Sequence, residues 1–199
     1  MPKQTARSLW AARIKQGTAA GGAKPVARPL SASRKAFSGV VLGIDPSLRG
    51  TGIAALLFKP PAVARILASE TVRPAKEAGL PECLGAIAGA VQRFIETYGP
   101  EVVAIEESIY VQNFRTAQKL GAARGAAIGQ AALKGLPVYE YPPLRIKQAV
   151  VGYGRASKEQ VTRQMSLLLG LKEHLPFDEA DAAATAFCHA MTLGRSVGS

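Results

Sequence analysis

Two short apolar runs, each ending in an acidic residue, limit the possible folds of this chain more than any other feature. Residues 39–45 read Gly-Val-Val-Leu-Gly-Ile-Asp, and residues 102–106 read Val-Val-Ala-Ile-Glu. Short runs rich in Val and Ile are typical of buried central strands. We therefore predict two central strands of a sheet, with Asp45 and Glu106 at their carboxyl ends.

The segment between these runs predicts a meander followed by a helix. A turn through Gly50 leads to a second strand at residues 51–58 and, after a Pro-Pro pair, to a third at residues 63–72. Three consecutive strands with short connections form an antiparallel meander. Apolar residues then recur at three- and four-residue spacings from Leu80 to a stop at Gly99, which predicts an amphipathic helix.

The remainder of the chain predicts alternating helices and one further strand. Residues 114–135 have a helical pattern rich in Ala and Gly, residues 136–141 form a strand, and two or three helices follow Pro143. Five strands in this order, with helices between the later ones, predict an α/β fold. We expect one mixed five-stranded sheet with helices on both faces.

The net charge of the chain, +11, is concentrated before residue 39. Residues 1–38 contain eight Lys or Arg and no Asp or Glu, and they are rich in Ala, Gly, Pro and Ser. Such segments are typical of disordered arms that bind nucleic acid, but an acid-free, Arg-rich leader is also typical of organellar targeting. We predict a basic arm or leader over residues 1–38 and one folded domain over residues 39–195.

Cysteine usage and hydropathy exclude two classes of protein. Cys83 and Cys188 lie far apart without metal-binding spacing, so we expect buried, reduced thiols rather than a zinc site or a disulfide framework. No apolar stretch approaches the roughly 20 residues that a membrane-spanning helix requires. We therefore expect no membrane segment.

A second pair of acids, Asp178 and Asp181, lies on a helix predicted over residues 177–187. Their three-residue spacing places both on one helical face. If that face covers the strand ends, these carboxylates meet Asp45 and Glu106 in one small volume. Like charges this close need cations, and hard oxygen ligands favour Mg²⁺ or Mn²⁺. The four acids predict a two-metal centre of the kind that cleaves phosphodiesters.

Each acid also has an ordinary structural interpretation. Asp45 is typical of a turn, Glu106 of a solvated strand end, and the Asp178 and Asp181 pair of a helix amino terminus favoured by its dipole. His189, eight residues beyond Asp181, either approaches the same site or is a structural histidine. The catalytic interpretation is favoured because the four acids occur together, in this order and on these elements.

In their order along the chain, several motifs resemble those of RuvC-type Holliday-junction resolvases. The first is Val-Leu-Gly-Ile-Asp-Pro-Ser-Leu-Arg-Gly-Thr-Gly at residues 41–52, the second is Ala-Ile-Glu-Glu at 104–107, and the last is Asp-Glu-Ala-Asp-Ala-Ala at 178–183. Two middle segments match as well, at residues 117–125 and 147–161. The resemblance spans about residues 39–192 and implies an RNase H-like fold.

The resemblance also implies an activity and a set of site residues. The activity is Mg²⁺-dependent cleavage, with Mn²⁺ as a substitute, that resolves four-way DNA junctions by paired symmetric cuts in homologous recombination and repair. Four residues are implied as catalytic acids that bind two ions per site: Asp45, Glu106, Asp178 and Asp181. Lys147 and Lys158 match lysines near the scissile phosphate, where an ammonium group stabilises developing charge, and Lys158 is counted among the catalytic residues. Further candidates for DNA contact, or else members of a solvated helix face, are Arg115, Lys119 and Arg124.

Two positions depart from the family's pattern, and one segment lies outside it. Ser47 stands where the family usually has Gly. Ile109 stands where many members have an aromatic residue, with Tyr110 beside it. Tyr110 is therefore our candidate for base stacking at the junction centre and for DNA contact. The basic segment before residue 39 is not covered by the resemblance.

The resemblance further implies partners and a location. These are a four-way junction, a second copy of the chain, the branch-migration proteins RuvA and RuvB, and the bacterial cytoplasm near the nucleoid, with organellar targeting by the leader as the alternative. Two copies are needed because resolution takes two symmetric cuts and each chain carries one set of acids. From Thr116 to Gly135, 11 of 20 residues are Ala or Gly. We predict that this helix lies near the dimer interface, or else that its small residues only seat it on its own sheet.

Three other classes of protein share features with this sequence. Another RNase H-like nuclease, acting on precursor rRNA or on RNA/DNA hybrids, shares the acidic core, although the paired Asp178 and Asp181 and the segment 147–158 favour a resolvase. A non-catalytic nucleic-acid-binding module of the same fold predicts a lost carboxylate, and all four are present. Actin-like kinases and ATPases open with a similar strand but need a much longer, two-domain chain.

Overall fold

The structure is a computed structural model that describes residues 36–60, 62–107 and 113–193. Almost all of the predicted basic segment, together with Ile109 and Tyr110, lies outside the described residues. No helix among the described residues is long and apolar enough to cross a lipid bilayer.

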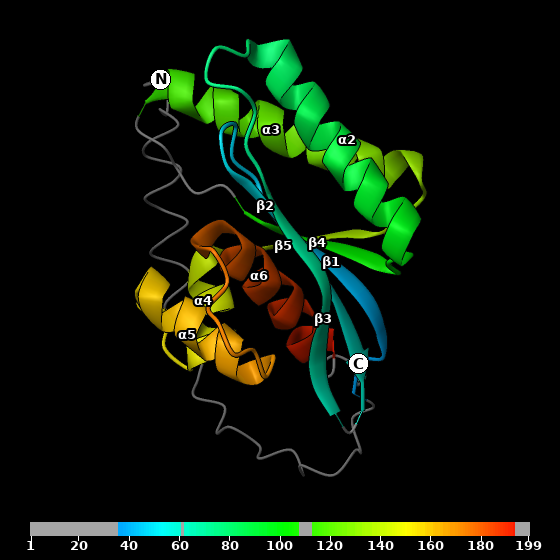
Figure 1. Cartoon of the computed structure of the whole chain (residues 1–199), viewed down its shortest axis with the longest axis vertical. Helices are drawn as coiled ribbons and strands as arrows, with labels where there is room; N and C mark the ends of the chain where they lie inside the picture. Colours follow the sequence, from blue (N-terminus) through cyan, green and yellow to red (C-terminus); the bar gives the residue numbers. More distant parts are fainter. Residues whose placement is uncertain (1–35, 61, 108–112, 194–199) are drawn as a thin grey trace, which may run out of the picture. The chain divides into compact units, whose positions relative to one another are not determined.

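A five-stranded mixed sheet lies at the centre of the described domain (Figure 1). Its strands stand in the order β3-β2-β1-β4-β5. Strands β1, β2 and β3 pair antiparallel, whereas β4 is parallel to β1 and β5 is parallel to β4. Their bounds are Gly39–Asp45 for β1, Thr51–Lys59 for β2, Ala62–Val72 for β3, Val102–Glu106 for β4 and Val138–Tyr141 for β5. The predicted mixed sheet is confirmed.

Helices cover both faces of the sheet, as predicted (Figure 1). Helices α2 (Leu80–Tyr98) and α3 (Phe114–Leu133) pack against one another on one face. The other face carries α6 (Phe177–Leu193), with α4 (Pro143–Val151) and α5 (Lys158–Leu168) packed on α6. The described residues from Pro143 onward form three helices, which agrees with the prediction of two or three.

The last strand begins two residues later than the sequence predicts. Gly135 adopts a left-handed φ of 68°, and the backbone N–H of Leu136 donates to the carbonyl of Ala131 at 3.0 Å. Leu136 therefore belongs to the carboxyl cap of α3 rather than to β5, because a left-handed residue and a bond back to the helix end the helix in this way.

The alternation of side chains along the strands divides the core into two clusters. Leu42, Ile44 and Ile105 point toward α2 and α3, where they pack with Ile87 and Val91. Their neighbours in sequence point the other way, toward α6. Asp45 and Glu106 continue this second set, because residues two apart on a strand share a face.

Helix α6 lies unusually close to the strands. A Cβ atom on Gly43 would meet the carbonyl of Ala182 at 2.0 Å, and one on Gly52 would meet the carbonyl of Asp178 at 1.9 Å. A glycine inside a strand permits such close backbone approach. The strand residues paired with Gly43 are also small, namely Ala54 on β2 and Ala104 on β4.

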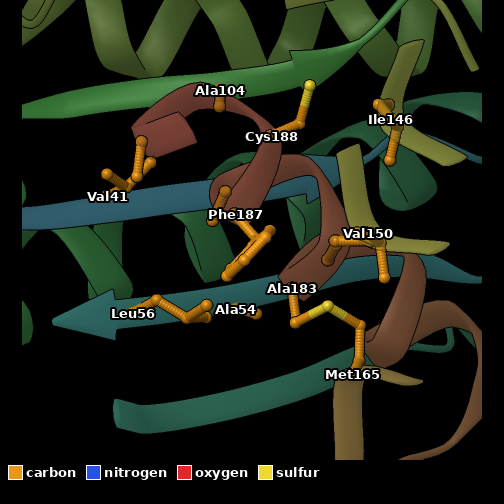
Figure 2. Packing of buried hydrophobic residues seen from close by; sticks show 14 of the residues in the cluster. Val41, Ala54, Leu56, Ala104, Ile146, Val150, Met165, Ala183, Phe187 and Cys188 are labelled. Carbon is orange, nitrogen blue, oxygen red and sulfur yellow. The ribbon is translucent and has the colours of Figure 1, made fainter. Parts of the chain in front are cut away.

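The side chains beyond this point of close approach complete the packing around α6. Figure 2 shows Phe187 of α6 lying between the strands and Val150 of α4. Met165 of α5 belongs to the same buried cluster. Because the strand residues beneath α6 are so small, the helix backbone itself forms part of the contact with the sheet.

Candidate active site

Asp45 and Glu106 lie side by side on the face of the sheet that α6 covers. Ile44 of β1 pairs with Ile105 of β4 in parallel register, so the acid that follows each of them stands at the same level. On the other side of β1, Asp45 pairs with Gly52. Two residues along the strands from Gly43, the sheet therefore carries a row formed by Asp45, Glu106 and Gly52.

Two hydroxyl groups of β3 fix the first turn of α6 above this row. The carboxylate of Glu179 accepts hydrogen bonds from Ser69 Oγ at 2.6 Å and from Thr71 Oγ1 at 3.2 Å. With Gly52 leaving room for the backbone at Asp178, this clamp places Asp178 and Asp181 over the ends of β1 and β2. The i, i+3 spacing then directs both acids toward the same volume.

Lys158 joins the site from α5. Its Nζ lies 3.1 Å from Oδ2 of Asp181. Burial alone would lower the pKa of Lys158, but the charges of Asp181 and Asp45 raise it overall, so the ammonium form is retained. Ser157 and Gln160 form a capping box at the start of α5, which fixes the position of Lys158 as the first helical residue.

Arg73, a residue that sequence reasoning missed, binds the outermost acid. Its Nη2 lies 3.2 Å from Oδ2 of Asp178. Arg73 follows β3 directly, and the pairing of Thr51 with Val72 brings this end of β3 beside the turn that follows β1. No motif marks Arg73 in the sequence; the register of the antiparallel meander is the signal that would have placed it here.

The acids are strongly coupled. Burial raises the pKa of Asp45 to about 7, and the charges of Asp181 and then Asp178 add to this effect, although Lys158 opposes it. Burial likewise raises the pKa of Glu106 to about 8, and the negative charge of Asp45 is the second cause of this increase. The pKa of Asp181 is also raised, mainly by burial and against the pull of Lys158. The charges of these acids therefore act on one another, while their convergence on one metal centre stays a prediction.

This donor set fits hard divalent cations. Several carboxylates in a partly buried volume repel one another, and nearby positive charge relieves that repulsion. Within the part of the chain that the structure describes, no three acidic, His or Cys side chains are already gathered in metal-binding geometry. Asp178 and Asp181 bind Arg73 and Lys158 instead. The carboxylate oxygens of these residues are of the kind that hard divalent cations prefer.

The other predicted DNA contacts are divided between two regions. Lys147 on α4 is half-buried and near enough to influence both Glu106 and Asp181. Arg115 and Lys119 are exposed near the start of α3. Arg124 differs from them because it forms an ion pair with Glu140 of β5 and is only one quarter exposed. The structure therefore joins Lys147 to the acids and leaves the α3 residues outside this cluster.

His189 and both cysteines are structural. His189 is fully buried, and its Nδ1 lies 2.8 Å from the hydroxyl of Tyr141. Burial lowers the pKa of His189 to about 4, so the neutral form is present near neutrality. Cys83 and Cys188 are buried free thiols, as predicted.

The turn after Asp45 does not require the family's usual glycine. Among the described residues no residue other than glycine has a positive φ, so Ser47 adopts an ordinary backbone conformation. The turn is closed by Thr51, whose hydroxyl donates to the carbonyl of Ser47 and accepts from its N–H. Arg49 in the same turn donates to the carbonyls of Ala75 and Ala78, which ties the β3–α2 connection to the site.

A mixed sheet of this topology, with acids at the ends of two adjacent strands and two more on a covering helix, defines a nuclease of the RNase H-like class. The comparisons with known proteins narrow this class. The sequence profile described as "Crossover junction endodeoxyribonuclease RuvC" matches residues 41–189. The chain therefore belongs to the RuvC family of crossover junction endodeoxyribonucleases, whose members are metal-dependent nucleases.

Individual relatives agree with this assignment. The crossover junction endodeoxyribonuclease RuvC of Cupriavidus metallidurans is 44% identical over 79% of this chain and 88% of its own length. That of Trichlorobacter lovleyi is 45% identical over 75% of this chain and 83% of its own length. Thermus thermophilus RuvC in complex with Holliday junction substrate superposes with a TM-score of 0.73 at 37% identity, covering 77% of this chain and 94% of that one. The yeast mitochondrial Holliday junction resolvase, at 13% identity and a TM-score of 0.54, shares the fold.

Proposed function

We propose that this protein resolves Holliday junctions by paired, symmetric phosphodiester cleavage in homologous recombination and DNA repair. The observation that carries the proposal is the placement of Asp45 and Glu106 side by side at the ends of β1 and β4, under α6, where Lys158 binds Asp181 at 3.1 Å. Similarity to a RuvC seen with Holliday junction substrate supports four-way junction DNA as the substrate.

We assign the four acids Asp45, Glu106, Asp178 and Asp181 as ligands of two Mg²⁺ ions, with Mn²⁺ as a substitute. Bound there, two such ions stabilise the charge that develops during in-line displacement at phosphorus. The chain's own contribution is positional. The strand ends hold Asp45 and Glu106 rigidly, while Lys158 and Lys147 place two ammonium groups at the edge of the acid cluster, where they attract the scissile phosphate and neutralise its charge.

The proposal is tested with three substrates of matched sequence: a synthetic four-way junction, a linear duplex and an RNA/DNA hybrid. We expect symmetric cuts in the junction with Mg²⁺, no cuts with EDTA, and little cleavage of the other two. Preferred cleavage of the hybrid would favour another RNase H-like activity, and a structured precursor rRNA added as a fourth substrate tests the rRNA-processing alternative. Tight junction binding without cleavage in Mg²⁺ or Mn²⁺ would favour a non-catalytic binding module.

The same proposal requires a two-fold homodimer. The structure favours a different face of α3 for the dimer interface than its buried alanines. Ala123, Ala127 and Ala131 are fully buried in the cluster that α3 forms with α2 of the same chain, so these small residues seat the helix within its own fold. The exposed side of α3 instead carries Gly121, Gly125 and Gly129. We propose this second face as the contact between copies.

A charged substitution on this exposed face tests the dimer. Gly125→Arg is expected to give monomers that nick junctions without resolving them, as judged by sedimentation and by product analysis. Gly89→Arg, at an exposed position of α2, is the matched control and should leave dimers intact. A wild-type protein that resolves junctions as a monomer would contradict the need for two copies.

Family membership and the sequence support three further proposals. We propose a cytoplasmic, nucleoid-associated location, cooperation with RuvA and RuvB, and a DNA-binding arm before residue 39. Eight positive charges without acids should add counterion release to DNA binding whatever the sequence. Deleting residues 1–36 is therefore expected to weaken junction affinity and flatten its salt dependence while keeping junction selectivity. An unchanged salt slope would favour a targeting leader.

A further inference from the structure

Two large apolar side chains are exposed on the part of the chain, residues 143–158, that also carries Lys147 and Lys158. Leu144 on the first turn of α4 is 60% exposed, and Tyr153 in the α4–α5 connection is 58% exposed. The connection packs directly on Leu144, because a Cβ atom on Gly154 would lie 3.2 Å from the Leu144 carbonyl and 3.7 Å from its Cδ2. We call Leu144 and Tyr153 the apolar ledge.

The backbone beneath Tyr153 is held firmly. Gly152 ends α4 in a left-handed conformation with φ of 81°, and its N–H donates to the carbonyl of Gln148. The N–H of Ala156 donates to the carbonyl of Tyr153 at 3.2 Å, and the side chain of Ala156 is buried. Tyr153 is thus the first residue of a closed turn anchored at both ends. Its exposure is a feature of an ordered turn.

Positive charge surrounds the ledge on the side of the acids. Lys147 lies one turn after Leu144 on α4, a spacing that puts both residues on the same side of the helix. Arg155 is exposed within the turn itself. Lys158 follows five residues after Tyr153, with its Nζ on Asp181. A DNA strand that presents its scissile phosphate to the acids and lysines would therefore have its neighbouring nucleotides beside Tyr153.

We propose that the apolar ledge recognises a nucleobase next to the scissile phosphate. The ring of Tyr153 stacks on the base, and Leu144 supports the tyrosine ring. Every base has an aromatic face, and bases that leave their duplex partners near a strand crossing expose it. Arg155 contacts the adjoining backbone phosphate. The inference rests on the proposed function and adds a base contact to a site otherwise built from acids and lysines.

A cycle that pairs a protein change with a DNA change tests the contact. Single-turnover cleavage is measured on junctions with an abasic nucleotide placed on either side of the scissile phosphate. For wild type, one of these positions is expected to slow cleavage by roughly tenfold, the size of a lost stacking contact. Tyr153→Ala should slow cleavage of the intact junction by a similar factor and make the enzyme insensitive to the abasic nucleotide. Independent, multiplying losses would overturn the proposal.

Two variants separate stacking from other effects. Tyr153→Phe keeps the ring and should behave like wild type, whereas losses as large as those of Tyr153→Ala would mean that the hydroxyl group, not stacking, makes the contact. Leu167→Ala, at an exposed leucine on α5, is the matched control and should change nothing. The cycle is also measured as junction affinity in EDTA, so it can succeed or fail independently of cleavage. A wild type that binds junctions but cuts none would count against the proposed function, while its affinity cycle would still decide on the ledge.

Discussion

The two faces of the sheet are packed by different means. On the face covered by α2 and α3, large aliphatic side chains such as Ile44 and Ile87 fill the space between strands and helices. On the face covered by α6, Gly43 and Gly52 bring helix backbone onto strand backbone. A core of large side chains can relax partly around a lost methyl group. Backbone-to-backbone packing has no such freedom, and the face that depends on it is the one that carries the four acids.

The largest expected effect follows from filling the space under α6. Gly43→Ala and Gly52→Ala put a Cβ atom within about 2 Å of a carbonyl oxygen of α6, so the helix must move away from the strands and take Asp181 with it. We expect a loss of stability of at least about 3 kcal/mol, the upper range for overpacked cores, and loss of junction cleavage even where the variant folds.

Gly89→Ala on α2 is the matched control, because nothing lies within 4 Å of a Cβ atom there. It should stabilise the protein by roughly 0.5–1 kcal/mol, since Ala favours a helix more than Gly does. Urea unfolding and junction cleavage measure both effects. Normal stability and cleavage in Gly43→Ala would show that α6 does not need this close approach.

The next effect concerns the opposite face, where stability and activity should separate. Ile87→Ala creates a cavity between α2 and the sheet and is expected to lower the free energy of unfolding by about 2–5 kcal/mol. Because the acids lie on the other face, cleavage per folded molecule should stay within a few-fold of wild type at low temperature. The exposed Leu80 provides a control, since Leu80→Ala should change neither quantity appreciably. Selective loss of cleavage in folded Ile87→Ala would break the distinction between the faces.

A smaller effect comes from titration of the acid row. Asp45 and Glu106 have folded-state pKa values of about 7 and 8, above those of unfolded carboxyl groups. The unfolded chain therefore releases these protons at lower pH, and stability without divalent cations falls as pH rises from about 4 to about 8. Glu106→Gln removes one of these titrations. Its free energy of unfolding should exceed that of wild type by roughly 2–4 kcal/mol at the upper end of this window, and by less at the lower end.

Urea unfolding in EDTA at about pH 5 and about pH 8 checks this prediction. Glu107→Gln changes the exposed neighbouring acid and should show no pH-dependent difference from wild type. An advantage of Glu106→Gln that does not vary with pH would mean that burial does not hold the Glu106 proton in the folded protein.

The smallest effect lies at the surface of the α2–α3 face. Lys134 Nζ lies 2.8 Å from Glu96, and the two side chains are 40% and 50% exposed. Exposed ion pairs contribute little because solvent and salt screen them. Lys134→Ala should change neither the Tm nor cleavage measurably, in contrast to Lys158→Ala, whose ion pair on the α6 face adjoins the acids and whose loss should slow cleavage strongly. Equal effects of Lys134→Ala and Lys158→Ala on cleavage would contradict the expected difference between the two faces.

Sequence reasoning predicted the sheet and the elements that carry the four acids, because both depend on local patterns, whereas the role of these acids as metal ligands stays a prediction. Apolar runs that end in an acid predict Asp45 and Glu106, and helical spacing predicts the pairing of Asp178 with Asp181. It did not predict Arg73 or the Glu179 clamp, because these contacts join residues more than 100 positions apart and depend on strand register. The sequence also could not predict which side of α3 faces α2. Small residues, Ala or Gly, recur on several sides of that helix, and only its packing in the fold distinguishes them.

The most direct test of the account is cleavage and binding of a four-way junction by Glu106→Gln and Glu107→Gln side by side. The two residues are neighbours in sequence, but Glu106 ends β4 within the acid cluster whereas Glu107 is exposed. We expect Glu106→Gln to lose at least about a hundredfold in cleavage rate, as with other losses of charge stabilisation at reacting groups, while its junction affinity stays near that of wild type. Glu107→Gln should cleave normally. Wild-type cleavage by Glu106→Gln would contradict the assignment of the acid cluster as the active site.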